Sequence, residues 1–407
     1  MQSDRGFCGP CGRPRITEEG KFLINQERLK NLLIELIKID SLSRKERDIA
    51  LRLKREMEEL GAAVWIDDAG EKMGGNVGNV IAHFYGNTPS ARPLLLSAHM
   101  DTVVPGEGVV PLLDGEILRT DGSTVLGGDD KSGVAIICEV LRVIRETGLA
   151  CGHLDVVFTI CEEAGLIGAK CLDVSRLRAR TGLVLDSDSV GLLLTKAPAA
   201  NRMEFHIRGL EAHAGVCPER GISAIKVAAE GIAQMKLGRI DHETTANIGL
   251  IDGGMAVNIV PNSVIMKGEA RSHSQEKLER QTQHMFDCLE EAAARHELKL
   301  EGKTFRAKLE AKIERDYEPM NVPDLAPIVQ LVHAAAKNLN LEIKTLATGG
   351  GCDANVLNQK GLEIANLSTG MRDIHTVNEW LDLKDLYLSA QVVLETVSLN
   401  ARHHPTP

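Results

Sequence analysis

Residues 94–104 (LLLSAHMDTVV) begin with a short apolar run that leads directly to a histidine, His99, and a carboxylate, Asp101. The run has the length of a buried strand, and in open α/β sheets ligands bind at the carboxyl ends of the strands. We therefore expect His99 and Asp101 to lie at the mouth of a site. An imidazole ligates metal well when its ring is held, and a nearby carboxylate can hold it. A solvated strand end is the alternative.

Two adjacent aspartates, Asp129 and Asp130, lie between a pair of glycines and an apolar run at 134–144 that reads as a buried helix. One aspartate at a helix N-terminus is usually a cap. Two aspartates after two glycines exceed what a cap requires, and glycine permits backbone conformations that other residues resist. We interpret this segment as a second part of a site.

Further carboxylates follow two predicted strands. The strand at 154–160 leads to Glu162 and Glu163, and the strand at 182–185 leads to Asp186. Neighbouring glutamates repel each other unless a cation or a proton separates their roles, so one can ligate metal while the other accepts a proton from water. An isolated glutamate pair is usually a solvated loop, but the same placement recurs along the chain. This repetition favours a site.

The pattern of predicted elements changes between residues 198 and 315. The order there is strand, helix, strand, strand, helix, strand, which is the ferredoxin-like pattern of a small α+β domain. The strands are predicted at 203–208, 245–251, 263–271 and 304–313, and the helices at 222–235 and 275–296. Acidic strand ends are lacking in this segment. We expect it to be a lid inserted into a catalytic domain made of residues 25–197 and 316–407.

The remaining segments predict an α/β catalytic domain with a central mixed sheet flanked by helices. Helices are predicted from Asn25, at 44–60, at 324–339 and from Leu383, and strands at 64–67, 79–85, 342–347 and 364–367. Residues 105–120 are rich in Gly, Pro and Asp and read as a loop. His375 lies between the last predicted strand and the last helix.

Composition narrows the function further. A chain of 407 residues exceeds one ordinary core, so two domains are expected. A net charge of -10 with 3% aromatic residues argues against nucleic-acid binding. No run approaches the ~18 apolar residues that span a membrane. Nine scattered cysteines do not resemble a disulfide framework. We expect a cytoplasmic enzyme without a membrane partner.

Residues 1–24 are expected to be an N-terminal tail. They contain Cys8 and Cys11 in a CxxC pattern. A redox centre would place this pattern between a strand and a helix, and no strand is predicted before it. One cysteine pair also supplies only half of a zinc site.

The motifs around these residues resemble those of the M20-type dinuclear zinc metallopeptidases, and most closely the peptidase T-like branch of tripeptide aminopeptidases. The resemblance extends over about residues 25–401. It implies that Glu162 is the general base and that Asp101 orients His99. It implies a ligand set in which one residue bridges both metal ions: His99, Asp129 as the bridge, Glu163, Asp186 and His375.

The same resemblance assigns substrate-binding residues to the lid. His213, in the sequence EAHAG, matches the family's oxyanion-stabilising histidine. Asn258 and Arg271 match positions that often hold a substrate carboxylate, although Arg271 could also be an ordinary surface arginine. In relatives the peptide bond between the paired aspartates is cis, so a cis Asp129-Asp130 bond is expected.

The resemblance implies hydrolysis of small peptides with the help of two divalent metal ions. Histidine and carboxylate ligands suit zinc, and cobalt or manganese fit the same ligands. The alternatives are an N-acyl-amino-acid amidohydrolase or a carboxypeptidase of the same family. A non-catalytic binding protein has no need of a base such as Glu162 beside the metal ligands. The exposed sheet edges expected in the lid also predict a homodimer formed through it.

Overall fold

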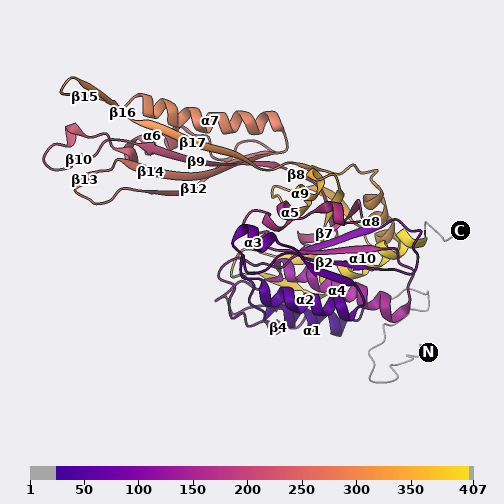
Figure 1. Ribbon diagram of the computed structural model, residues 1–407. Helices are drawn as coiled ribbons and strands as arrows, with labels where there is room; N and C mark the ends of the chain where they lie inside the picture. Colours follow the sequence, from indigo (N-terminus) through magenta and orange to yellow (C-terminus); the bar gives the residue numbers. More distant parts are fainter. Residues whose placement is uncertain (1–23, 403–407) are drawn as a thin grey trace. The chain divides into compact units, whose positions relative to one another are not determined.

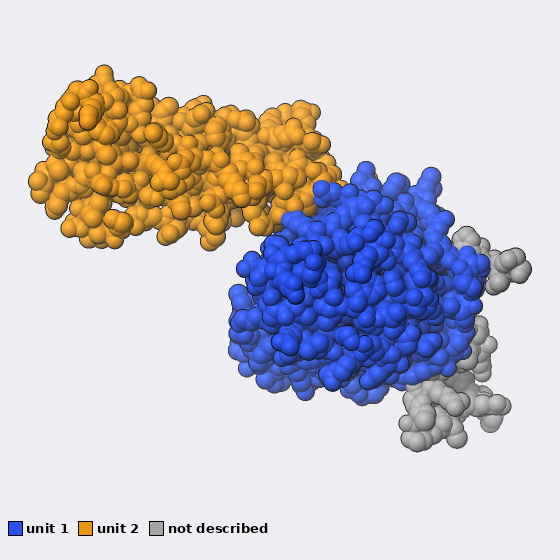
Figure 2. Space-filling view, in the orientation of Figure 1, with its two compact units in different colours: residues 1–195, 321–347, 352–407 blue, residues 196–320, 348–351 orange. Residues whose placement is uncertain are grey.

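The computed structural model describes residues 24–402 (Figure 1). The chain divides into two compact units, shown in different colours in Figure 2. Among the described residues, unit 1 comprises residues 24–195, 321–347 and 352–402, and unit 2 comprises Lys196–Met320 and Thr348–Gly351. The predicted tail with Cys8 and Cys11 lies outside the described residues.

Unit 1 is built on a mixed sheet, as predicted. Its twelve strands within the described chain are β1 (Ala63–Ile66), β2 (Val80–Phe84), β3 (Leu94–His99), β4 (Leu112–Asp114), β5 (Ile117–Arg119), β6 (Leu154–Thr159), β7 (Thr181–Asp188), β8 (Leu192–Ala197), β18 (Met320–Asn321), β19 (Lys344–Ala347), β20 (Glu363–Arg372) and β21 (Trp380–Asp382). The main path runs β1-β2-β6-β3-β7-β20-β21-β5-β4. The central strands β6, β3, β7 and β20 are mutually parallel, so their carboxyl ends meet at one edge.

Helices cover both faces of this sheet. They are α1 (Gln26–Ile37), α2 (Arg47–Glu59), α3 (Ala69–Met73), α4 (Gly128–Thr147), α5 (Ile167–Cys171), α8 (Pro327–Asn338), α9 (Asp353–Gln359) and α10 (Leu383–Arg402). Figure 1 shows α1, α2 and α4 on one face and α5 and α9 on the other. In the described part of the chain, no helix has both the length and the apolar character needed to cross a membrane.

Local sequence explains where the central elements begin. The Asn25 side chain accepts a hydrogen bond from the Arg28 N–H at 3.1 Å and caps α1, which begins where the sequence predicts a helix. Every residue of β3 is buried, because parallel neighbours and helices enclose both of its faces. The long helix α4 is buried over most of its length between the sheet, α1 and α10.

Unit 2 confirms the predicted strand and helix order, with additions. Its elements are β9 (Ala199–Arg208), β10 (Ala212–His213), α6 (Ala224–Gln234), β11 (Gly238–Arg239), β12 (Thr244–Gly253), β13 (Ile259–Val260), β14 (Ser263–Ser272), α7 (Gln275–Ala294), β15 (Glu297–Leu300), β16 (Lys303–Arg306) and β17 (Lys308–Tyr317). The main sheet has the order β11-β12-β14-β9-β17 and is antiparallel. Helices α6 and α7 pack on it around an apolar core that includes Met203, Phe205 and Met285.

Some sequence predictions were wrong in detail. The predicted loop at 105–120 contains the hairpin β4–β5, whose turn is made by Gly115 with φ 63°. The single strand predicted at 304–313 is two strands, because β16 pairs with β15 whereas β17 pairs with β9. Helix α3 and strand β8 were not predicted; both are short.

Candidate metal centre

The predicted metal ligands of unit 1 meet at the carboxyl edge of its parallel strands. His99 is the last residue of β3, and Asp186 lies in the last part of β7. Asp129 lies in the first turn of α4, which follows the β4–β5 hairpin. Glu163 follows β6, and His375 lies in the loop between β20 and β21. The edge of the sheet at which ligands bind in open α/β folds therefore carries all of them.

Two groups of donor atoms share the carboxylate of Asp129. His99 Nε2 lies 3.1 Å from Asp129 Oδ1 and 3.8 Å from Asp186 Oδ1. His375 Nε2 lies 3.1 Å from Asp129 Oδ2 and 2.8 Å from Glu163 Oε1. Within each group the donor atoms lie within 4.8 Å of one another. One oxygen of Asp129 thus faces each histidine.

The backbone around Asp129 has the conformation that the paired glycines indicated. Gly127 has a φ of +73°, which a residue with a side chain rarely adopts. The Asp129-Asp130 peptide bond is cis, as expected. Asp130 turns inward: its Oδ2 accepts from the His99 N–H at 3.1 Å, and its Oδ1 accepts from the Gly133 N–H at 3.1 Å. Asp130 therefore ties the end of β3 to the start of α4.

Asp101 holds its neighbours in a different way from the one expected. His99 Nδ1 contacts the Asp101 main-chain oxygen at 2.8 Å, whereas the Asp101 carboxylate is 3.5 Å away from this nitrogen. The carboxylate instead accepts from the main-chain N–H groups of Glu162 and Glu163, at 2.8 and 3.2 Å, and from the Ser43 hydroxyl at 2.6 Å. Asp101 thus fixes both the histidine ring and the glutamate pair.

Glu162 lies beside both groups of donors. Its carboxylate is within 4.8 Å of a His99 nitrogen and a Glu163 oxygen, and the residue is buried. Burial raises the pKa of Glu162, and repulsion from Asp353 and Glu163 adds to the rise. A buried carboxylate with a raised pKa beside metal ligands has the environment of a general base.

The electrostatics of the centre favour cations. Burial opposes the charge of Asp129, but hydrogen bonds with His375 and His99 outweigh it and lower the pKa of Asp129. Burial and the Asp129 charge raise the pKa of Asp186. Hydrogen bonds with Asp129 and Glu163 raise the pKa of His375 to about 10. Imidazole and carboxylate donors at this spacing fit divalent transition-metal ions, whose charge would offset the surplus of carboxylates.

Sequence reasoning missed three buried carboxylates around the centre. Glu46 Oε1 accepts from the Cys161 N–H at 3.0 Å. Asp353 Oδ2 accepts from the Thr159 hydroxyl at 2.5 Å. Glu379 accepts from main-chain N–H groups before α4. Only Glu379 has a signal in the sequence, because it lies in the same short loop as a predicted metal ligand.

The three predicted substrate-binding residues belong to unit 2. His213 ends β10, which pairs with β13, and the Ala214 N–H donates to the Asn258 main-chain oxygen at 2.9 Å. His213 and Asn258 are therefore neighbours. Arg271 lies near the far end of β14, where its guanidinium binds the Glu269 carboxylate with both Nε and Nη2, at 2.9 and 3.0 Å.

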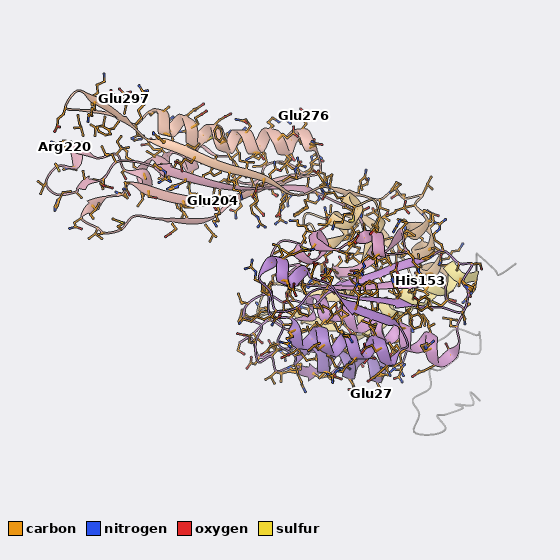
Figure 3. The ribbon with its side chains drawn as sticks, viewed as in Figure 1. Glu27, His153, Glu204, Arg220, Glu276 and Glu297 are labelled. Atoms are coloured by element: carbon orange, nitrogen blue, oxygen red, sulfur yellow. The ribbon has the colours of Figure 1, made fainter. Side chains whose placement is uncertain are left out.

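A further group of possible ligands lies at the opposite end of β6. His83 Nδ1 and His153 Nε2 contact Asp155 Oδ1 at 2.6 and 2.8 Å (His153 is labelled in Figure 3). Asp155 Oδ2 accepts from the main-chain N–H groups of Arg178 and Ala179 at 2.6 and 2.7 Å. These are hydrogen-bond distances, and the carboxylate is fully paired. We interpret this group as a tether for the loop before β7.

Comparisons with known proteins agree with this geometry. The model of the Peptidase family M20/M25/M40 matches residues 95–399. The YqjE protein of Bacillus subtilis (strain 168), described as uncharacterized, is 39% identical over 93% of this chain and 100% of its own length. The structure of the aminopeptidase PepT from Bacillus cereus ATCC 10987 is 38% identical, with a TM-score of 0.81 over 93% of this chain and 99% of that one.

A second solved structure, a tripeptidase from Staphylococcus aureus, is 37% identical, with a TM-score of 0.85 over 93% of this chain and 100% of that one. The family match covers the strands and loops that carry the candidate metal ligands. The chain belongs to the M20/M25/M40 peptidase family.

Proposed function

We propose that the protein is a dinuclear metallopeptidase of the peptidase T type that removes the N-terminal residue from tripeptides. The carboxylate of Asp129, shared between a His99 group and a His375 group, is the observation that carries the proposal. A shared carboxylate is what two adjacent metal ions require. The solved tripeptidase and the aminopeptidase PepT support the choice of substrate.

The ligands of the first ion would be His99, Asp129 and Asp186, and those of the second Asp129, Glu163 and His375. Zinc suits these donors, and cobalt or manganese are the other candidates. Bound divalent metals supply Lewis acidity and lower the pKa of water. Glu162 would accept the proton of the attacking water and deliver it to the leaving amine, and Asp101 would hold Glu162 in place through its main-chain N–H.

Unit 2 would act as a substrate-binding lid. In this role, His213 supplies a hydrogen-bond donor to the oxyanion, and Asn258 and Arg271 hold the substrate carboxylate. Arg271 pairs with Glu269 through two of its five N–H donors, so a substrate carboxylate would have to share the guanidinium with Glu269 or displace it.

We further propose that unit 2 forms a homodimer contact. Strand β11 pairs only with Thr245 and Ala246 of β12, and residues 247–253 have no strand partner on that side within the described chain. Leu250 and Ile251 on this edge are 65% and 56% exposed. An unpaired edge with exposed apolar side chains is a surface that a second copy can cover.

A substrate panel tests the activity. The metal-free protein, reconstituted with two equivalents of zinc, is assayed on one tripeptide sequence with a free N-terminus, an acetylated N-terminus or an amidated C-terminus, and on the matching dipeptide and N-acyl amino acid. We expect cleavage of the free tripeptide and loss of activity on the acetylated one. Preferential cleavage of the acetylated substrate or of the N-acyl amino acid would instead identify the amidohydrolase or carboxypeptidase alternative.

A further inference from the structure

Glu379 contacts the loop that carries the shared aspartate. Its Oε1 accepts from the Asp129 N–H at 3.0 Å, and its Oε2 accepts from the Gly127 N–H at 2.8 Å. The side chain is buried, with 2% of the residue exposed. Both oxygens of one carboxylate therefore hold the main chain on either side of Gly128.

The glycine pair before Asp129 fits this carboxylate. A Cβ atom at Gly128 would lie 3.0 Å from Glu379 Oε1, which is closer than most side chains allow. Gly127 has a positive φ that turns its N–H toward Glu379. The two glycines thus let the main chain approach Glu379, so the need for them is explained by this contact rather than by helix capping.

Glu379 and His375 belong to the same loop between β20 and β21. The loop is closed by its own hydrogen bonds: the Thr376 hydroxyl donates to the Asp373 main-chain oxygen at 2.8 Å, and the Glu379 N–H donates to the Thr376 main-chain oxygen at 3.1 Å. His375 reaches the carboxylate of Asp129 while Glu379 reaches its main chain. The loop between β20 and β21 therefore contacts both the side chain and the main chain of Asp129.

We propose that Glu379 is a positioning residue that sets the affinity for the second metal ion, the one held by Asp129, Glu163 and His375. This inference rests on the proposed dinuclear centre. Removing the Glu379 charge weakens the link between the Asp129 main chain and the loop that carries His375. Asp129 and His375 are then no longer held in fixed positions relative to each other. The first group keeps His99 and Asp186, which are fixed by β3 and β7. Residues that orient metal ligands typically change metal affinity about 10–100-fold.

Zinc binding to the Glu379→Gln variant tests the proposal. The amide keeps the size of the side chain but places a donor group opposite one main-chain N–H. Titration of the metal-free protein against a competing chelator should show the second zinc ion bound about 10–100-fold more weakly than in wild type, with a much smaller change for the first. Excess zinc should restore kcat without changing KM for the tripeptide.

Glu139→Gln is the matched control, because Glu139 is also buried and accepts from a main-chain N–H, that of Asn25, at 3.0 Å. It contacts α1, and we expect wild-type zinc affinity for this variant. Unchanged binding of both ions in Glu379→Gln, equal weakening of both, or the same loss in Glu139→Gln overturns the inference. The metal-free variants are compared by thermal unfolding, so that a folding defect is seen separately. If the wild-type protein binds fewer than two zinc ions, the proposed function fails as well.

Discussion

Asp101 and Glu162 are joined by a hydrogen bond in which the Glu162 main-chain N–H donates to Asp101 Oδ1 at 2.8 Å. The next N–H along the chain, that of Glu163, donates to the other oxygen of the same carboxylate. One buried aspartate thus fixes the backbone of both glutamates and leaves their carboxylates available. Glu163 faces His375, and Glu162 lies near His99. This arrangement makes separate roles for the two glutamates testable.

Replacing Glu162 with Ala should abolish turnover while zinc content stays near two per chain. The reason is that the proposed ligand groups do not require the Glu162 carboxylate, whereas proton transfer does. A loss of about 100-fold or more in kcat is expected. Metal analysis of the purified variant, together with steady-state kinetics, checks both halves of the prediction.

Glu163→Ala is the matched comparison and should lose the second zinc ion. If instead Glu162→Ala loses metal and Glu163→Ala retains it, the two roles are assigned the wrong way round. Thermal unfolding of both metal-free variants should resemble that of the wild type, because the Asp101 hydrogen bonds reach the main chain and not the substituted side chains.

Zinc binding should release protons at neutral pH. The pKa of His375 is raised to about 10 by Asp129 and Glu163, so its ring is protonated at pH 7 in the metal-free protein. The pKa of Asp186 is raised by burial, which also favours its protonated form. Metal ligation requires the deprotonated forms, so the apparent zinc affinity should rise as pH increases from 7 toward 10. Calorimetry in buffers of different ionisation enthalpy measures the number of protons released.

His375→Ala should release fewer protons and show a weaker dependence of affinity on pH. His213→Ala, in unit 2, should behave like wild type in this experiment. Zinc binding that is independent of pH between 7 and 10 would contradict the assignment of His375 as a ligand.

The raised pKa of His375 also affects the stability of the metal-free protein. Protonated His375 stabilises the folded state fully below its unfolded pKa near 6.5, and this stabilisation is lost as pH rises through the folded pKa of about 10.

The order of the elements and the convergence of several strand-end carboxylates with His99 were predictable because strand ends carry local signals. The mostly apolar residues 94–98 lead to His99 and Asp101, and the glutamate pair Glu162-Glu163 follows the buried strand β6 in the same way. The ferredoxin-like order of unit 2 was visible from alternating and helical periodicity. Short elements such as β4 and α3 were missed, because their few residues carry no recognisable hydrophobic period.

The supporting carboxylates could not be predicted in the same way. Glu379 accepts from the Asp129 N–H although the two residues are 250 positions apart in the sequence, and Glu46, just before α2, accepts from the Cys161 N–H. Such contacts are made between segments that are distant in the sequence, and an isolated glutamate in a polar segment reads as a surface residue. The sequence also could not show which atom of Asp101 holds the His99 ring. The main-chain oxygen of Asp101, and not its carboxylate, makes the shorter contact with His99 Nδ1.

Asp155→Asn should destabilise the fold without affecting the metal centre. The buried Asp155 carboxylate is paired with two imidazoles and two main-chain N–H groups, and an amide would turn one acceptor into a donor. A decrease of about 2–4 kcal/mol in the free energy of unfolding is expected. Denaturant unfolding measures it, and zinc content at low temperature should remain near two. Loss of metal in the folded variant would show that this group serves the metal centre.

The last prediction is that His213 acts across a dimer. Within unit 2, His213 and Asn258 lie where β14 begins, whereas Arg271 lies near its other end. The strand from Ser263 to Arg271 spans about 26 Å, but an extended tripeptide spans only about 10 Å. If His213 and Arg271 both contact one tripeptide, they must come from two copies of the chain.

Mixing two inactive variants, Glu162→Ala and His213→Ala, tests this argument. In a mixed dimer, the His213→Ala chain keeps an intact Glu162 and would receive His213 from its partner. Random mixing makes half of the dimers mixed, with one competent site in two, so about one quarter of wild-type activity should return. Mixing two differently tagged preparations of Glu162→Ala is the control and should stay inactive. Verified mixed dimers without activity would mean that each chain uses its own His213, and that Arg271 then has no part in binding the same tripeptide.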